Sequence, residues 1–140
     1  MKRVVVTGMG IVSSIGNNSN EVLASLREAK SGIRADESYV DHNFRSQVSG
    51  RPDLAPFEVL DSRTVRLMRQ GTAWNYIAMQ QAIVDAGLEP GEVVNPRTGI
   101  IMGSGGPSTK AIVEAATKTV ESCSPKRIGP LAVPNAMSST

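Results

Sequence analysis

At 140 residues, the chain has the length of one ordinary domain and can bury a hydrophobic core. Its 15 basic and 13 acidic residues leave a formal net charge of +2, which is too balanced to indicate a nucleic-acid partner. One cysteine excludes an internal disulfide, and one histidine argues against a conventional zinc site. No apolar run approaches the roughly 18 residues of a membrane span. We therefore expect a cytoplasmic protein without a metal, a cofactor or a membrane partner.

The first expected element is a buried strand at Arg3 to Thr7, because three consecutive valines favour a strand covered on both faces. The pattern Gly8-x-Gly10-x-x-Ser13 that follows is close to the dinucleotide-binding fingerprint. Its third glycine is missing, however, and no acidic residue follows a second strand at the required distance. The preferred interpretation is a tight turn that ends the strand.

A helix is predicted over Asn20 to Lys30, where apolar residues recur at helical spacing. Asn18 or Ser19 can cap it, and Ser31-Gly32 is expected to stop it. Residues 33–60 carry no clear period and are expected to be an irregular surface excursion, with a possible short strand at Ser46 to Gly50. His42 lies in this excursion and is interpreted as an exposed loop residue rather than a catalytic base.

Arg63 to Ala86 is predicted to be helical and capped by Asp61, and Gly71 is the point near which the helix can break. Gly87 should end this helix, and Pro90 should prevent its return. In its second half, residues four apart form a face that allows close approach of another element: Trp74, Ala78, Ala82 and Ala86.

A second strand is predicted at Thr98 to Met102, followed by the glycine loop Gly103 to Gly106 and a helix over Ser108 to Glu121. The loop lacks the spacing of a phosphate-binding loop, and Ser104 lacks the G-x-S-x-G context of an esterase nucleophile. The order of elements indicates a piece of an α/β layer, in which two strands are few for this many helices.

Two groups of basic residues leave their role open. Arg63, Arg66 and Arg69 fall three apart near one helix face, and Lys126 adjoins Arg127. They can form a solvated face or a positive patch for an acidic partner. Cys123 has no neighbouring histidine in the sequence and is interpreted as a surface thiol without a function.

Five segments occur in a recognisable order: RVVVTGMGIVSSIGN at Arg3 to Asn17, LREAKSGI at Leu26 to Ile33, DAGL at Asp85 to Leu88, RTGIIMGSGG at Arg97 to Gly106, and VPNAMSS at Val133 to Ser139. Together they resemble the amino-terminal part of a β-ketoacyl-acyl-carrier-protein synthase, and DSRTVRLM with GSGG resembles the type I enzyme most. The resemblance covers residues 1–140. It implies an α/β fold, the amino-terminal portion of a thiolase-like layered α/β/α/β/α fold that is incomplete in this chain.

The resemblance also implies an activity for the whole protein. These condensing enzymes of fatty-acid synthesis join an acyl chain to malonyl-carrier in a decarboxylating Claisen condensation, and they act as homodimers. Their partners are acyl carrier protein and its acyl and malonyl thioesters. The family nucleophile, a cysteine at a helix N-terminus, and two histidines lie downstream of the VPNAM motif. We therefore expect no catalytic residue among these 140 residues and no activity from them alone. The alternative is a non-catalytic fragment that binds the carrier or a dimer partner.

Site residues are implied by position. Arg63 and Arg66 match the basic helix positions that receive the acidic carrier protein, and Lys126 falls near the second basic contact of the family.

Other positions match the acyl pocket and the dimer edge. Gly105 and Gly106 match the loop at the edge of the acyl pocket, and Met137 matches a residue that reaches across the dimer interface to line the partner's pocket. Pro107 stands where the type I enzyme is expected to have another small residue, so the chain-length preference stays open.

Overall fold

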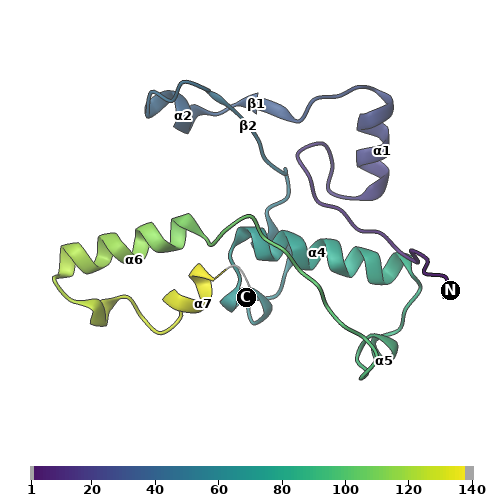
Figure 1. The fold of residues 1–140 in the computed structure, drawn as a ribbon. Coiled ribbons are helices and arrows are strands. Elements are labelled where there is room, and N and C mark those ends of the chain that lie inside the picture. Colours follow the sequence, from purple (N-terminus) through teal and green to yellow (C-terminus); the bar gives the residue numbers. More distant parts are fainter. Residues whose placement is uncertain (1, 138–140) are drawn as a thin grey trace. The chain divides into compact units, whose positions relative to one another are not determined.

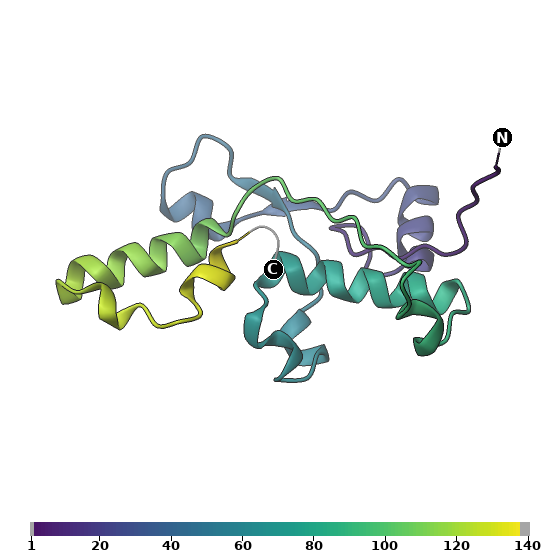
Figure 2. The ribbon, with the colours of Figure 1, turned by 60° about the horizontal axis from the view of Figure 1, so that its bottom comes forward.

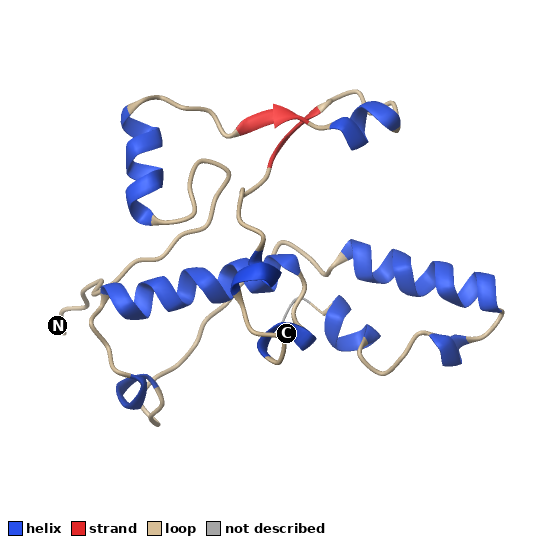
Figure 3. Cartoon of the chain, turned by 180° about the vertical axis from the view of Figure 1, so that it is seen from behind, coloured by secondary structure: helices blue, strands red, loops and turns tan. Residues whose placement is uncertain are grey.

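The computed structural model describes residues 2–137. The chain divides into two compact units. The first comprises Met1–Pro56 with Trp74–Asn95, and the second comprises Phe57–Ala73 with Pro96–Thr140. Helices and loops predominate, and the strands of the described part form one short antiparallel pair (Figure 3). No helix within residues 2–137 has the length and apolar character needed to cross a bilayer.

The elements follow one another as Figure 1 labels them. The first unit holds α1 Ser19–Arg27, β1 Ile33–Ala35, α2 Glu37–Asp41, β2 Val48–Gly50, most of α4 Gln70–Asp85, and α5 Pro90–Val93. The second unit holds most of α3 Pro56–Val59, the 3-10 helix η1 Thr64–Leu67, the start of α4, α6 Thr109–Ser122, the 3-10 helix η2 Pro125–Arg127, and α7 Ala132–Ala136.

Helix α1 begins as expected and ends early. The side chain of Asn18 accepts a hydrogen bond from the Glu21 backbone at 3.0 Å, which confirms it as the N-cap. The helix ends at Arg27, before the predicted stop, because Ala29 adopts the left-handed conformation with φ 52°. The Lys30 amide then donates to the Ser25 carbonyl at 2.8 Å, the closing bond of a helix C-terminus.

Residues 33–60, expected to be an irregular excursion, contain four short elements. Strands β1 and β2 pair antiparallel, with Ile33 opposite Gly50 and Ala35 opposite Val48. Strand β2 confirms the short strand predicted within Ser46 to Gly50. Helices α2 and α3 complete the segment. Its interpretation as a surface excursion with its own role stays a prediction.

A buried carboxylate holds the hairpin and α2 together. Asp36 is 7% exposed and caps α2 by accepting from the Ser38 backbone and from the Ser38 hydroxyl at 2.6 Å. The Ser49 hydroxyl of β2 donates to its second oxygen at 2.7 Å, and Arg51 lies 2.7 Å from the same oxygen. The hydrogen bond from Ser38, followed by that from Ser49, lowers the pKa of Asp36 from its ordinary value of 3.8.

The two strands predicted at Arg3 to Thr7 and Thr98 to Met102 are wrong for this chain. Neither segment is paired in a sheet with any described residue. Their side chains are exposed: Val4 is 94% and Ile101 is 99% accessible. A strand exists only where a neighbour supplies its ladder of hydrogen bonds, and partners in a parallel sheet come from distant parts of a chain. Apolar content alone therefore predicted the wrong local state.

The small-residue face of α4 is confirmed. A methyl group added at Gly10 would overlap the carbonyl group of Ala78, and one added at Gly8 would lie 2.8 Å from the Ala86 Cβ. Neither glycine has a positive φ. The pair therefore serves close packing against a helix and not the tight turn that the sequence suggested.

Side chains of α4 also bind the backbone of this N-terminal segment. The Met9 amide donates to Asp85 at 2.9 Å, and the Ile11 amide donates to Gln81 at 3.1 Å. Gln81 in turn donates to the Asn17 carbonyl at 2.7 Å. The segment is thus held by helix side chains in place of a neighbouring strand.

The helix predicted over Arg63 to Ala86 is broken, as the sequence suggested. Asp61 accepts from the Arg63 and Thr64 amides at 2.9 and 3.0 Å, and the 3-10 helix η1 follows. Met68 is extended with ψ 143°, and α4 starts afresh at Gln70.

The far end of α4 agrees only in part with the prediction. Gly87, with φ 66°, ends the helix as expected. The helix does not return after Gly87, as expected, although Pro90 opens a separate short helix, α5, that was not predicted. Proline is tolerated in a first helical turn, where no backbone donor is required.

In the second unit, α6 confirms the helix predicted over Ser108 to Glu121 to within one residue. Ser108 caps it by accepting from the Ala111 amide at 3.3 Å. The Ser108 amide donates to the Ala136 carbonyl of α7 at 3.0 Å. Figures 1 and 2 show α7 beside α6, and Ala111 is buried at 3% exposure.

Candidate functional site

A cavity of about 420 Å³ lies in the second unit. Its charged lining comes from two places in the sequence: Arg66 and Arg69 from η1 and the residues after it, and Glu114 and Lys118 from α6. The remaining lining is largely apolar and is supplied by Ala111, Ala115, Ile128, Gly129, Pro130, Leu131, Ala132 and Asn135. The lining therefore combines apolar residues with three cationic side chains and one acidic side chain.

The three arginines Arg63, Arg66 and Arg69 differ in whether their charge is paired. Arg69 pairs with Glu114 at 3.4 Å, with both side chains partly exposed at 37% and 41%. Such a pair contributes about 0.2–1 kcal/mol to stability. Arg63 and Arg66 are exposed and form no ion pair with another described residue. The structure therefore leaves two of the three charges available to a partner.

The second basic group lies in η2, where the Ser124 hydroxyl accepts from the Lys126 amide at 3.3 Å. Lys126 and Arg127 are both exposed. Arg127 lines a further cavity of about 340 Å³, together with Lys118, Glu121 and Ser122. Arg63 and Lys126, both predicted carrier contacts, line neither cavity.

Lys118 was not singled out by any motif in the sequence. It lines both cavities and is exposed on α6. Residues four apart share a helix face. The spacing of Glu114, Lys118 and Ser122 therefore indicates that these three side chains lie along one face of α6.

The glycine loop Gly103 to Gly106 lines neither the 420 Å³ nor the 340 Å³ cavity. The Ser104 hydroxyl donates to the Gly106 carbonyl at 2.8 Å, and Gly105, Gly106 and Pro107 are exposed. Met137 caps α7, where its amide donates to the Val133 carbonyl at 3.1 Å, and its side chain is exposed. The assignment of these residues to an acyl pocket or dimer edge stays a prediction.

Neither reactive side chain is placed for nucleophilic catalysis. Cys123 is exposed at the C-terminal end of α6, where it adopts φ 48°. A helix C-terminus carries partial negative charge and does not stabilise a thiolate, unlike the N-terminus that the resemblance implies for the nucleophile. His42 ends α2, with its Nδ1 2.7 Å from the Ser38 carbonyl oxygen.

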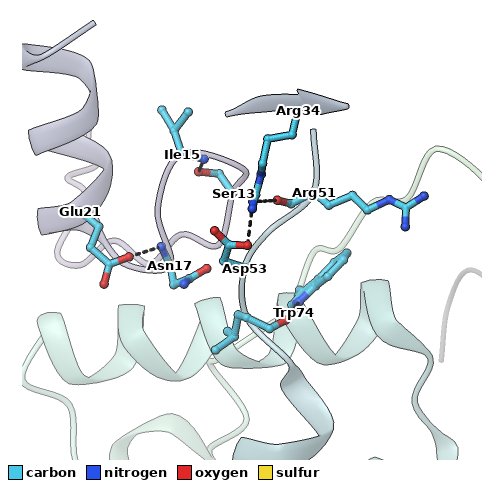
Figure 4. A network of polar contacts seen from close by, with 9 residues as sticks. Ser13, Ile15, Asn17, Glu21, Arg34, Arg51, Asp53 and Trp74 are labelled. Carbon is cyan, nitrogen blue, oxygen red and sulfur yellow. Dashed lines mark hydrogen bonds and ion pairs between the residues drawn. The ribbon is translucent and has the colours of Figure 1, made fainter. Parts of the chain in front are cut away.

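A polar cavity of about 520 Å³ in the first unit is held by contacts among its own residues (Figure 4). Arg34 pairs with Asp53 at 2.7 Å and donates to the Arg51 carbonyl at 3.2 Å. Glu21 accepts from the Asn17 amide at 2.8 Å. Arg34, Asp53 and Glu21 thus have partners within this unit. We therefore assign these side chains a role in holding the unit together and not in binding a ligand.

The sequence model described as "Beta-ketoacyl synthase, N-terminal domain" matches residues 1–140. The chain belongs to the β-ketoacyl synthase family. Its sequence is 46% identical to 3-oxoacyl-[acyl-carrier-protein] synthase 1 of Escherichia coli K12, over 99% of the chain and 34% of that protein. It is 44% identical to the synthase 1 of Haemophilus influenzae, over the whole chain and again 34% of the relative. The synthase 2 of Coxiella burnetii is 31% identical over 97% of the chain.

Solved structures show the same fold. A β-ketoacyl synthase from Burkholderia phymatum STM815 superposes with a TM-score of 0.78 at 27% identity, covering 98% of this chain and 34% of that structure. The ishigamide ketosynthase/chain length factor superposes with a TM-score of 0.83 at 24% identity, also over 98% and 34%, and supports the fold alone. This confirms the expected α/β class as an amino-terminal portion of the thiolase-like fold.

The chain spans about a third of the length of these relatives. Its backbone superposes on a much longer synthase, although its two predicted strands belong to no sheet in the described part of the chain.

Proposed function

We propose that the full-length protein is a 3-oxoacyl-acyl-carrier-protein synthase of fatty-acid biosynthesis. The observation that carries this proposal is 44–46% identity, across the whole chain, to proteins named 3-oxoacyl-[acyl-carrier-protein] synthase 1. In the reaction, malonyl-carrier loses carbon dioxide, and the carbanion that remains attacks the acyl thioester. The acyl group is transferred to that carbon, a new carbon–carbon bond forms, and the thiolate leaves.

Within that enzyme, this portion supplies docking and shape and not the reacting groups. Arg63, Arg66 and Lys126 receive the acidic carrier protein, and the exposure of all three supports this role. The whole protein is a cytoplasmic homodimer. Gly105, Gly106, Pro107 and Met137 border its acyl pocket and dimer edge. The 140 residues alone are inactive, since neither Cys123 nor His42 has a catalytic setting.

The test is condensation by the full-length protein. Purified protein is mixed with an acyl-carrier and malonyl-carrier, and the carrier-bound products are weighed by mass spectrometry. The expected result is a 3-oxoacyl-carrier two carbons longer than the primer, with release of carbon dioxide. Carrier binding without any such product would instead favour the alternative, a non-catalytic carrier-binding protein.

A further inference from the structure

Lys118 joins the two groups of basic residues into one surface. It lines the 420 Å³ cavity together with Arg66, and it lines the 340 Å³ cavity together with Arg127. All three side chains are exposed and belong to the second unit. Without Lys118, the two groups would be separate charges from distant parts of the sequence.

The charges around the two cavities do not cancel. Four cationic and two acidic side chains line them. Arg69 is paired with Glu114, and Glu121 lies in the smaller cavity. Lys118 itself forms no ion pair with any residue in the described part of the chain. The surface therefore keeps an excess positive charge centred on α6.

The larger cavity adds an apolar element to this charge. Its lining includes Ala111, Ala115, Ile128, Pro130 and Leu131 in addition to the charged residues. An apolar side chain flanked by carboxylates fits such a site. The side chain can enter the cavity while the carboxylates form ion pairs with Arg66 and Lys118. An amphipathic helix on an acidic protein presents that pattern.

We propose that Lys118 determines the specificity of the carrier-docking surface. Because it lines both the cavity that contains Arg66 and the cavity that contains Arg127, one acidic partner can contact all three cations. This proposal rests on the proposed function, because acyl carrier protein is the partner it assigns. Lys118 acts in docking and not in the condensation chemistry. Arg69 is paired with Glu114. Removal of the Glu114 charge would therefore leave the Arg69 charge available to the acidic partner.

The test measures the Kd of acyl carrier protein for the full-length protein at low ionic strength. Lys118→Gln should weaken binding about 1.5-fold to fivefold, the range expected for one exposed ionic contact. Lys118→Arg should bind as the wild type does, and Glu114→Gln should bind more tightly. The matched control is Lys110→Gln, which removes the same charge from an exposed position on α6 that lines neither cavity.

The outcomes separate this inference from the proposed function. Equal losses for Lys118→Gln and Lys110→Gln would reduce the effect to net charge and overturn the role of Lys118. The role would also fail if a short DNA duplex bound with the same dependence on Lys118, since the surface would then accept any polyanion. Absence of carrier binding by the wild-type protein would instead contradict the proposed function. Both lysines are exposed, so unchanged melting temperatures should show that every variant is folded.

Discussion

At the scale of single residues, glycine acts here by leaving room. Gly10 packs on α4 so closely that a Cβ would lie 2.8 Å from the Ala82 amide nitrogen. Gly10→Ala in the full-length protein should therefore destabilise it by about 1–3 kcal/mol, the usual range for overpacking. Urea unfolding measures the change.

A matched substitution should have the opposite sign. Gly71 lies within α4 with nothing within 4 Å of an added Cβ, so Gly71→Ala should stabilise by about 0.5–1 kcal/mol through the helix propensity of alanine. Equal stability of the two alanine variants would show that the close approach of Gly10 to Ala78 is absent from the folded protein.

A second residue-scale prediction concerns acid. Because the pKa of Asp36 is lowered in the folded state, its ionised form contributes stability above the ordinary value of 3.8, and this contribution is lost as the pH falls through the lowered pKa. Asp36→Asn should lower the melting temperature near neutral pH and should flatten its decline below about pH 4. The pKa of Asp61 is also lowered, mainly by the hydrogen bond from Thr64. The melting temperature of the Asp36→Asn variant should therefore still fall in acid, but less than that of the wild type. Parallel acid profiles for variant and wild type would contradict this role of Asp36.

At the scale of elements, local signals predicted the helices and failed for the strands. Asn18 and Asp61 each accept hydrogen bonds from the first amides of the element that the sequence assigned to them, because capping uses partners within three residues. Ser108, predicted as the first residue of its helix, is the N-cap of α6. Helix C-termini were less predictable, as the early end of α1 at a left-handed Ala29 shows. Strand pairing depends on distant partners, so Arg3 to Thr7 could not be placed from its valines alone.

The unpaired apolar segments give an element-scale prediction. In the full-length protein, the amides of Val4 to Val6 and Ile100 to Met102 should be protected from hydrogen exchange by neighbouring strands. In the isolated 140-residue chain they should exchange rapidly, since these side chains are largely exposed there. Rapid exchange in both proteins would refute the view that further chain covers these segments.

At the scale of the whole molecule, the family was predictable from segments in register, and much of the site was not. Arg63 and Arg66 were predicted from spacing and resemblance, and both are exposed. The spacing could not show that Arg69 is paired with Glu114, 45 residues away, because that pairing depends on tertiary packing. It also gave no reason to connect Lys118 with Arg66 and Arg127, which only the shared cavities do.

Carrier docking by the cationic surface is tested most directly by the affinity of acyl carrier protein for the full-length protein. The measurement compares the wild type with the double variant Arg63→Glu and Arg66→Glu, at low and at high salt. Reversal of two exposed charges should weaken binding about tenfold or more at low salt, and the difference should shrink as salt screens the interaction. An unchanged affinity at low salt would contradict carrier docking at this surface.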